Sequence, residues 1–182
     1  MKIHKLPKTC SLALSGGIDS VFGFYFLKQV PSRLISCIHI NHGTEKADEY
    51  EDFCLRLCNY YGIRLDVYYY DKNQPMTEDA WHFYRYNIFN SYPDKVIVCH
   101  HKDDNLENKL LFGKIMQPES GNIVRPFLQV TKEEIKKRMY FHDCPYIQDY
   151  TNFDVNFTKR NKVRKIIQEL KDMGCALDSL LQ

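Results

Sequence analysis

The sequence has 182 residues, 44% of them hydrophobic, which fits one domain with an ordinary core. The formal net charge of +2 neither requires nor excludes a nucleic-acid partner. No apolar run is long enough to cross a membrane, residues 1–10 lack the apolar stretch of a signal peptide, and the seven scattered cysteines include no C-x-x-C pair, so we expect a cytoplasmic protein with free thiols and no membrane partner.

Strand and helix patterns alternate along the first two thirds of the chain. Short segments rich in β-branched, aromatic or leucine residues predict strands at 9–15, 33–40, 64–70 and 95–100. Longer segments between them predict helices at about 19–29, 45–61, 77–90 and 103–116. This alternation favours an α/β fold with a doubly wound, Rossmann-like parallel sheet of about five strands.

The last third of the chain has a different pattern. Residues 123–127 (IVRPF) are expected to add one short strand. Thr131 and Glu134 have the spacing of a capping box, which predicts a helix to about residue 141. A final basic helix is expected from about 157 to 171, ended by Gly174. We therefore divide the chain into a domain at 1–122 and, within the same fold, a small C-terminal helical extension at 123–182.

Residues 15–20 (SGGIDS) join the first predicted strand to the first predicted helix. The backbone N–H groups of such a turn form an anion site with those of the first helical turn, and glycines let a phosphate approach closely. A plain connecting turn is the simpler alternative, but it needs one glycine and no flanking serines. The loop is neither a Walker A loop nor a dinucleotide fingerprint.

This loop resembles the S-G-G-x-D-S loop of the N-type ATP pyrophosphatases, the PP-loop enzymes. Further patterns resemble, in order, those of the tRNA(Ile)-lysidine synthases: N-H-G at 41–43, E-x-A-x₄-R-Y at 78–86, and the segments 100–108, 125–128, 149–154 and 160–164. The resemblance covers residues 9 to about 167. It implies an adenine nucleotide alpha hydrolase-like fold, with ATP, tRNA and lysine as substrates. An anticodon cytidine would be adenylated and then attacked by the lysine ε-amine, releasing pyrophosphate and AMP.

The resemblance also implies which residues bind ATP and Mg²⁺. Asp19 is expected to hold Mg²⁺ on the phosphates, since this hard cation prefers carboxylate and phosphate oxygens. The predicted ATP-binding residues are Ser15, Gly16, Gly17, Ile18, Asp19, Ser20, His39, Asn41 and His42.

Asp104 and Glu107 lie three residues apart at a predicted helix start, so their side chains share a face. A carboxylate there can hold the ammonium group of lysine and later accept its proton. His100 is a candidate for neutralising phosphate charge or for acid–base work. Simple N-capping is the alternative for this cluster, and we expect it to explain Asp103.

The final basic helix places Arg160 and Arg164 four residues apart, where both can point at one phosphate. Its lysines, Lys159, Lys162 and Lys165, are either contacts for the tRNA backbone or a solvated face. Cys54, Cys58 and Cys99 are expected to pack in the core, and Trp81 in the core or an interface.

Known members of this family carry C-terminal domains that help to hold tRNA, whereas this chain ends soon after Arg164. How tRNA is held, which tRNA is used and the oligomeric state, a homodimer included, therefore stay open. Two other functions are alternatives: another PP-loop tRNA-modifying enzyme such as a thiolase, and a non-catalytic nucleotide- or RNA-binding module. The cysteine positions disfavour the first, and the presence of Asp19, Asp104 and Glu107 disfavours the second.

Overall fold

A mostly parallel sheet forms the centre of the computed structural model, which describes residues 1–29, 33–148 and 159–181. Its six strands lie in the order β3-β2-β1-β4-β6-β5. Their bounds are β1 (Cys10–Ala13), β2 (Leu34–Asn41), β3 (Arg64–Tyr69), β4 (Val96–Ile97), β5 (Glu119–Ser120) and β6 (Ile123–Val124). The predicted α/β fold is confirmed, but the sheet has six strands because β5 pairs antiparallel with β6 as a short hairpin.

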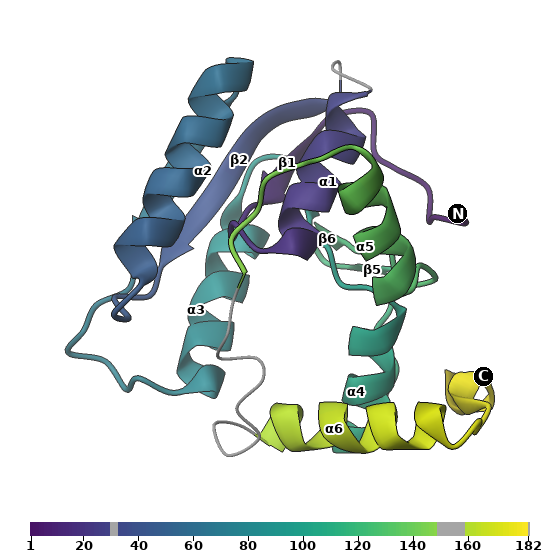
Figure 1. Ribbon diagram of the computed structural model, residues 1–182. Coiled ribbons are helices and arrows are strands. Elements are labelled where there is room, and N and C mark those ends of the chain that lie inside the picture. The colour runs from purple at the N-terminus through teal and green to yellow at the C-terminus, as the bar shows by residue number, and fades with distance from the viewer. Residues whose placement is uncertain (30–32, 149–158, 182) are drawn as a thin grey trace.

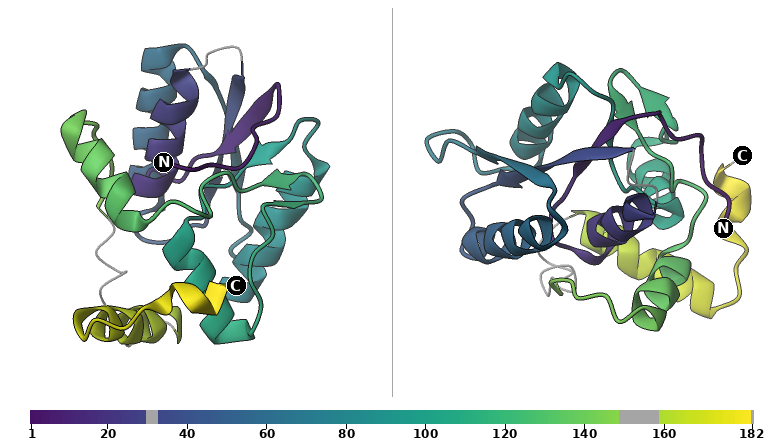
Figure 2. Two further views of the ribbon diagram at one scale, coloured as in Figure 1. Left: turned by 90° about the vertical axis from the view of Figure 1, so that its right-hand side faces the viewer. Right: turned by 90° about the horizontal axis from the view of Figure 1, so that it is seen from above.

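Helices cover both faces of this sheet (Figure 1). They are α1 (Ile18–Lys28), α2 (Ala47–Tyr61), α3 (Glu78–Ser91), α4 (Lys102–Phe112), α5 (Lys132–Phe141), α6 (Lys159–Asp172) and the 3₁₀ helix η2 (Leu177–Leu181). Seen from above in Figure 2, α1, α2 and α5 lie on one side of the sheet and α3 on the other. The described part of the chain has no helix long and apolar enough to span a membrane.

Two apolar clusters fill the space on the two faces. The larger contains fully buried Leu12, Phe24 and Cys54, and the smaller packs Phe89 of α3 against Val96. Cys54, Cys58 and Cys99 are buried, as expected of core residues. Phe127 and Ile135 belong to the larger cluster, so the segment after residue 122 shares the core of the first segment. The division at 122 falls between the two strands of the β5–β6 hairpin.

Strand β4 is shorter than the predicted segment 95–100. Only Val96 and Ile97 pair with β1 and β6. The N–H of Val98 still donates to the Val124 carbonyl at 2.9 Å, after which the chain leaves the sheet to reach the N-cap of α4 at His101. This departure turns two consecutive histidines toward the ends of the central strands.

Helix α6 lies across α4 beneath the sheet (Figure 1). Its described part begins at Lys159, so the expected start at 157 lies outside the described residues. It ends at Asp172, and Gly174 follows with φ of +80°, the left-handed backbone expected of a residue that ends a helix. The ion pair between Lys171 and Asp103 ties α6 to the start of α4.

Candidate active site

The loop after β1 is open at the start of α1. The N–H of Ser15 donates to Ser20 Oγ at 3.1 Å, and Ser20 Oγ donates to the Gly17 carbonyl at 2.9 Å. Gly17 is the N-cap of α1, and no side chain in the described ranges caps that helix. Gly16 has φ of +86°, and a Cβ there would lie 3.3 Å from the Tyr50 ring. The Ile147 N–H also donates to the Gly16 carbonyl at 3.0 Å, and Ile147 pairs with Gly17 as a parallel bridge. The serines and this bridge hold the loop in shape, and an anion can take the N–H groups of the first turn of α1 that the bridge does not use.

Asp19 lies in the first turn of α1 and faces two cationic or ionisable groups. The Lys132 ammonium lies 2.6 and 2.5 Å from its two carboxylate oxygens. His101 Nε2 lies 3.6 Å from Asp19 Oδ1 and 3.4 Å from Asp104 Oδ2. The adjacency of β1 and β4 thus brings the glycine loop and the paired histidines together, as the sequence predicts for neighbouring strands.

The start of α4 corrects the expectation for the aspartate pair. Asp104, not Asp103, completes the capping box: its carboxylate accepts from the His101 N–H at 2.9 Å, and its own N–H donates to His101 Nδ1 at 3.4 Å. Asp103 instead accepts from the Lys132 N–H at 2.8 Å, which caps the first turn of α5. Asp104 takes the capping position because the N-cap is His101, which places Asp104 at the third helical position.

The ionisation states of this cluster follow from burial and neighbouring charge. Burial alone raises the pKa of Asp104, but His101, through its charge and its backbone N–H, and the Lys132 ammonium outweigh it, so the pKa lies below its ordinary value. Burial lowers the pKa of His100 to about 4, with help from Arg125. Arg125 Nε lies 3.2 Å from His100 Nδ1, and because the guanidinium can only donate, His100 accepts there and is neutral.

Glu107 is buried on the next turn of α4 and meets both arginines of α6. Arg164 Nε donates to Glu107 Oε1 at 2.8 Å, and Arg160 Nη1 donates to Oε2 at 3.3 Å. Burial raises the pKa of Glu107, and Arg164 opposes that rise. The two arginines therefore point together, as their spacing indicates, but their common partner is a carboxylate.

Helix α3 supplies the outer contacts of this cluster. Glu78 lies 3.4 Å from Arg160 Nε. The Tyr86 hydroxyl accepts from Arg125 Nη2 at 3.1 Å, which holds the guanidinium that donates to His100. The E-x-A-x₄-R-Y segment thus supports the arginines and His100 from the side of the sheet opposite α1.

Three ring nitrogens are buried without a partner among the described residues, near the end of β2: His39 Nε2, His42 Nδ1 and Trp81 Nε1. His39 Nδ1 bonds the Leu14 carbonyl at 2.9 Å, directly before the glycine loop. The His42 and Trp81 rings lie 5.3 Å apart. Burial lowers the pKa of His39, and it lowers that of His42 to about 4, so both rings are neutral near pH 7. Neutral rings with unused nitrogens can hydrogen-bond a heterocyclic base.

Asn41 is already engaged within the protein. Its Oδ1 accepts from the Gly43 N–H at 2.8 Å, and its Nδ2 donates to Asp48 and Glu51. These bonds shape the turn after β2, so a direct contact of Asn41 with ATP stays a prediction.

The residues present fit a magnesium ion shared with a polyphosphate. Within residues 1–29, 33–148 and 159–181, no three histidine, cysteine or acidic side chains gather as a metal site. Asp19 offers carboxylate oxygens beside the open N–H groups of α1. Mg²⁺ commonly binds through one or two carboxylates, substrate phosphates and water. Asp19 can therefore hold the ion once phosphates supply other ligands.

Sequence reasoning did not single out Lys132. It is the first residue of α5, after the Thr131 N-cap, and pattern alone gives an exposed lysine at that position. It lies 113 residues from Asp19, so only the packing of α5 against α1 brings the two charges together. The predicted D-x-[ST]-N-x-D segment at 149–154 lies outside the described residues.

Comparisons with known proteins agree with this geometry. A family model described as PP-loop domain matches residues 3–170. The tRNA(Ile)-lysidine synthase of Bacteroides thetaiotaomicron is 32% identical over 178 residues, covering 84% of this chain and 41% of that protein. The one from Neisseria meningitidis serogroup B is 29% identical over 189 residues, covering 90% of this chain and 43% of that protein. The chain spans less than half the length of these relatives.

Solved structures show the same fold. The U34-tRNA thiolase NcsA from Methanococcus maripaludis superposes with a TM-score of 0.72 at 19% identity, covering 92% of this chain and 68% of that one. An NH3-dependent NAD synthetase from Campylobacter jejuni gives 0.53 at 17% identity, covering 92% and 77%. The match of the family model over nearly the whole chain, together with the open glycine loop at the end of β1, shows that the chain belongs to the PP-loop family of ATP-using proteins.

Proposed function

We propose that this chain is the catalytic part of a tRNA-modifying ligase that forms lysidine. The carbonyl oxygen of an anticodon cytidine attacks the α-phosphorus of ATP, and the bond to pyrophosphate breaks. The ε-amine of free lysine then attacks the activated carbon, the bond to AMP breaks, and the nitrogen loses a proton. The names of the relatives at 29–32% identity support this reaction over others of the family.

The observation that carries the proposal is the placement of Glu107. It is a buried carboxylate one turn along α4 from Asp104, and Asp104 shares His101 with Asp19 at the phosphate loop. Lysine has an ordinary pKa of about 10.4 and must lose a proton to attack. Because burial raises the pKa of Glu107, it is a stronger proton acceptor than an exposed carboxylate. Asp104 attracts the ammonium form, since His101 and Lys132 outweigh the effect of burial and keep its pKa below the ordinary value.

The opposite end of the site suits ATP. The N–H groups of Gly17, Ile18 and Asp19 receive phosphate oxygens, and the Lys132 ammonium neutralises charge beside them. Mg²⁺ on Asp19 stabilises negative charge on the leaving pyrophosphate when bound. His39 and His42 provide unused nitrogens for the base.

The test is incubation of the protein with tRNA transcripts, ATP and lysine, followed by nucleoside mass spectrometry and analysis of the nucleotide products. We expect lysidine, AMP and pyrophosphate, all abolished by Asp19→Asn. Formation of ADP and phosphate would contradict cleavage of ATP between its α and β phosphates. Formation of AMP without lysidine would contradict lysine as the nucleophile.

The same incubation with a sulfide or persulfide donor in place of lysine tests the thiolase alternative. A thiolase needs an accessible sulfur donor or cluster ligands, and five of the seven cysteines here are buried in the core. The other two, Cys144 and Cys175, are the thiols that a sulfur relay could use. A thiolated nucleoside that disappears on Cys144→Ser or Cys175→Ser would favour that reaction over lysidine formation.

A further inference from the structure

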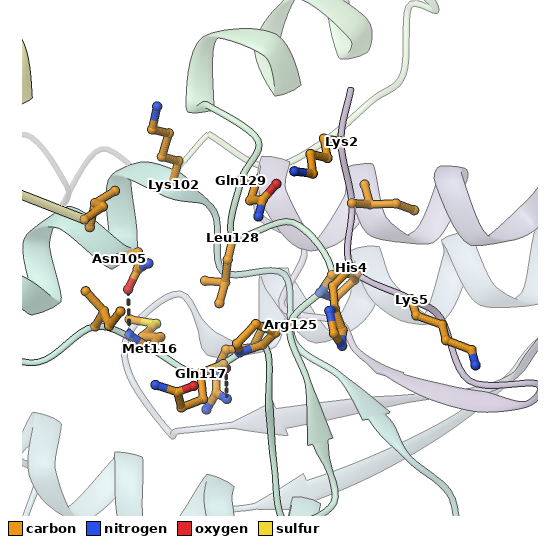
Figure 3. Close-up of a pocket in the computed structure, with 15 residues that line it drawn as sticks. Lys2, His4, Lys5, Lys102, Asn105, Met116, Gln117, Arg125, Leu128 and Gln129 are labelled. Carbon is orange, nitrogen blue, oxygen red and sulfur yellow. Dashed lines mark hydrogen bonds between the residues drawn. The ribbon is translucent and has the colours of Figure 1, made fainter. Parts of the chain in front are cut away.

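A cavity of about 620 Å³ lies beside α4, between the N-terminal segment and the chain that follows β6 (Figure 3). Lys2, His4 and Lys5 line one side, and Lys102 and Asn105 of α4 line the other. Arg125, Leu128 and Gln129 lie between these two walls (Figure 3). Leu181 of η2 completes the lining.

The charge of this lining is one-sided. Three lysines, one arginine and a histidine line the cavity, and the described lining includes no aspartate or glutamate. The whole chain is nearly balanced, with 25 lysines and arginines against 23 acids. Glu119 follows the lining residue Pro118, and its carboxylate is paired with Lys95 at 2.7 Å. The cavity is therefore a local positive site on a nearly neutral protein, which is a surface suited to an anion.

The basic N-terminal wall is fixed to the body of the protein. The His4 N–H donates to the Pro126 carbonyl at 2.9 Å, and Arg33 donates to the Pro7 carbonyl at 2.6 Å. Ile3 and Leu6 pack against the larger apolar cluster. Because Ile3 and Leu6 face the core, Lys2 and Lys5 on either side of Ile3 are held at the cavity.

The cavity also adjoins the candidate active site. Lys102 and Asn105 lie on the helix that carries Asp104 and Glu107. Arg125 is shared: it lines the cavity and donates to His100. Arg125 therefore stands between a ligand in the cavity and His100 of the candidate active site. Apolar side chains such as Ile115, Met116 and Leu128 offer a contact surface to a planar or apolar part of that ligand.

We propose that this cavity binds backbone phosphates and an adjoining nucleoside of the RNA substrate. The volume lies in the range of small-ligand pockets, so it can take about one nucleotide with its phosphate. Sites for single-stranded RNA combine positive charge along the backbone with a surface that contacts the bases. Here the lysines supply the charge, and Ile115, Met116 and Leu128 supply the contact surface. The inference rests on the proposed function, because it takes RNA as the substrate, and it adds the place at which that RNA binds.

The test compares Lys2→Gln/Lys5→Gln with the control Lys8→Gln/Lys136→Gln. Both double variants remove two exposed lysine charges, and the control positions do not line the cavity. A third variant, Gln129→Glu, adds an acid to the lining at an exposed position and removes no lysine. Binding of tRNA transcripts is measured between roughly 50 and 200 mM salt, with ATP binding measured in parallel.

We expect the Lys2/Lys5 variant to bind tRNA about three- to tenfold more weakly at low salt, and its salt slope to fall by about 0.7–0.9 for each phosphate that it no longer neutralises. Gln129→Glu should weaken tRNA binding in the same direction, while the control variant and all ATP affinities stay near wild type. Equal tRNA binding by the Lys2/Lys5 and control variants would overturn the proposal, as would a loss of ATP binding in place of tRNA binding.

These outcomes are separable from those for the reaction. If wild type forms lysidine and the cavity variants bind tRNA like the control, the assignment of the cavity fails and the reaction stands. If tRNA binding depends on Lys2 and Lys5 but no lysidine forms, the reaction fails and the cavity remains an RNA site.

Discussion

The ammonium group of Lys132 lies 2.6 and 2.5 Å from the two carboxylate oxygens of Asp19. The pair joins the first turn of α1 to the first residue of α5, beside the open N–H groups of the glycine loop. Both side chains are about one third exposed, so the pair contributes only about 0–1 kcal/mol to stability. Because the pair lies at the proposed phosphate site, we expect the main role of Lys132 to be neutralising phosphate charge.

We therefore predict that Lys132→Met reduces the rate of pyrophosphate release by roughly a hundredfold, since the variant lacks one positive group facing the developing phosphate charge. Urea unfolding should shift little, because the pair is partly exposed. Lys136→Met, at an exposed position on the same helix, is the matched control. A Lys132→Met protein with wild-type turnover would show that this lysine serves only to neutralise Asp19.

The sequence predicts the order of strands and helices because each has a local pattern, and it predicts the polar loops because glycines, serines and paired histidines stand at strand ends. The resemblance to PP-loop folds, which place the first and fourth strands together, also implies that residues 15–20 and 100–107 face one crevice. In the structure Asp19 and His101 of these segments lie 3.6 Å apart. The role of Lys132 could not be predicted from the sequence, because its partner Asp19 lies 113 residues away and only the packing of two helices brings them together. The choice between Asp103 and Asp104 depends on a one-residue difference in the helix start, which patterns do not fix.

The neutral state of His100 predicts how stability varies with pH. Burial holds its folded pKa at about 4, against an ordinary value of 6.5. Between these values the unfolded chain binds more protons than the folded one, so stability rises with pH through this window and is lost as the pH falls. Within this window His100 alone changes the free energy of unfolding by about 1 kcal/mol per pH unit.

We expect His100→Gln to flatten this part of the stability curve, measured by urea unfolding at several pH values from about 4 to 6.5. Glutamine keeps an acceptor for the Arg125 guanidinium, so the neighbouring bonds survive the change. His142→Gln, at an exposed position, controls for the removal of a histidine. An unchanged slope in His100→Gln would mean that His100 is not buried in its neutral form.

A close approach between α1 and the end of β4 gives a prediction about packing. A Cβ added at Gly23 would lie 2.3 Å from the Cys99 sulfur. Gly23→Ala should destabilise the protein by roughly 1–3 kcal/mol through overpacking, although alanine is the better helix former. Combining it with Cys99→Ala removes the clashing atom, so the double variant should be more stable than the sum of the single changes predicts. Additive unfolding free energies would contradict this contact.

The buried carboxylate of α4 should govern the second half of the reaction. Glu107→Gln removes the proposed proton acceptor for lysine and the carboxylate charge that pairs with Arg160 and Arg164. We expect the KM for lysine to rise and lysidine formation to fall, while tRNA-dependent pyrophosphate release continues. Separate measurement of the two products checks this, with Glu169→Gln on the exposed side of α6 as control. Equal loss of both products would place Glu107 at the adenylation step.

The basic residues of helix α6 point in two directions. Arg160 and Arg164 turn inward to Glu107, whereas Lys159, Lys162 and Lys165 are exposed. Arg164→Ala should therefore reduce turnover by more than it reduces tRNA affinity. Replacing the three lysines by glutamine should do the reverse, because exposed lysines contact phosphates without touching the reacting groups.

The lysine variant is the sharper of these two tests. Each lysine that neutralises a phosphate should add roughly 0.7–0.9 to the slope of log affinity against log salt, so replacing three such lysines should lower the slope by about 2–3. ATP binding should persist, since the phosphate loop supplies its own N–H donors on α1. Combining the α6 lysine changes with Lys2→Gln/Lys5→Gln tests whether this surface and the cavity act separately, because the losses of tRNA binding free energy at two separate surfaces should add. If the α6 lysine variant binds tRNA with unchanged affinity and slope, its exposed face is only solvated, and the protein either holds RNA elsewhere or does not bind it.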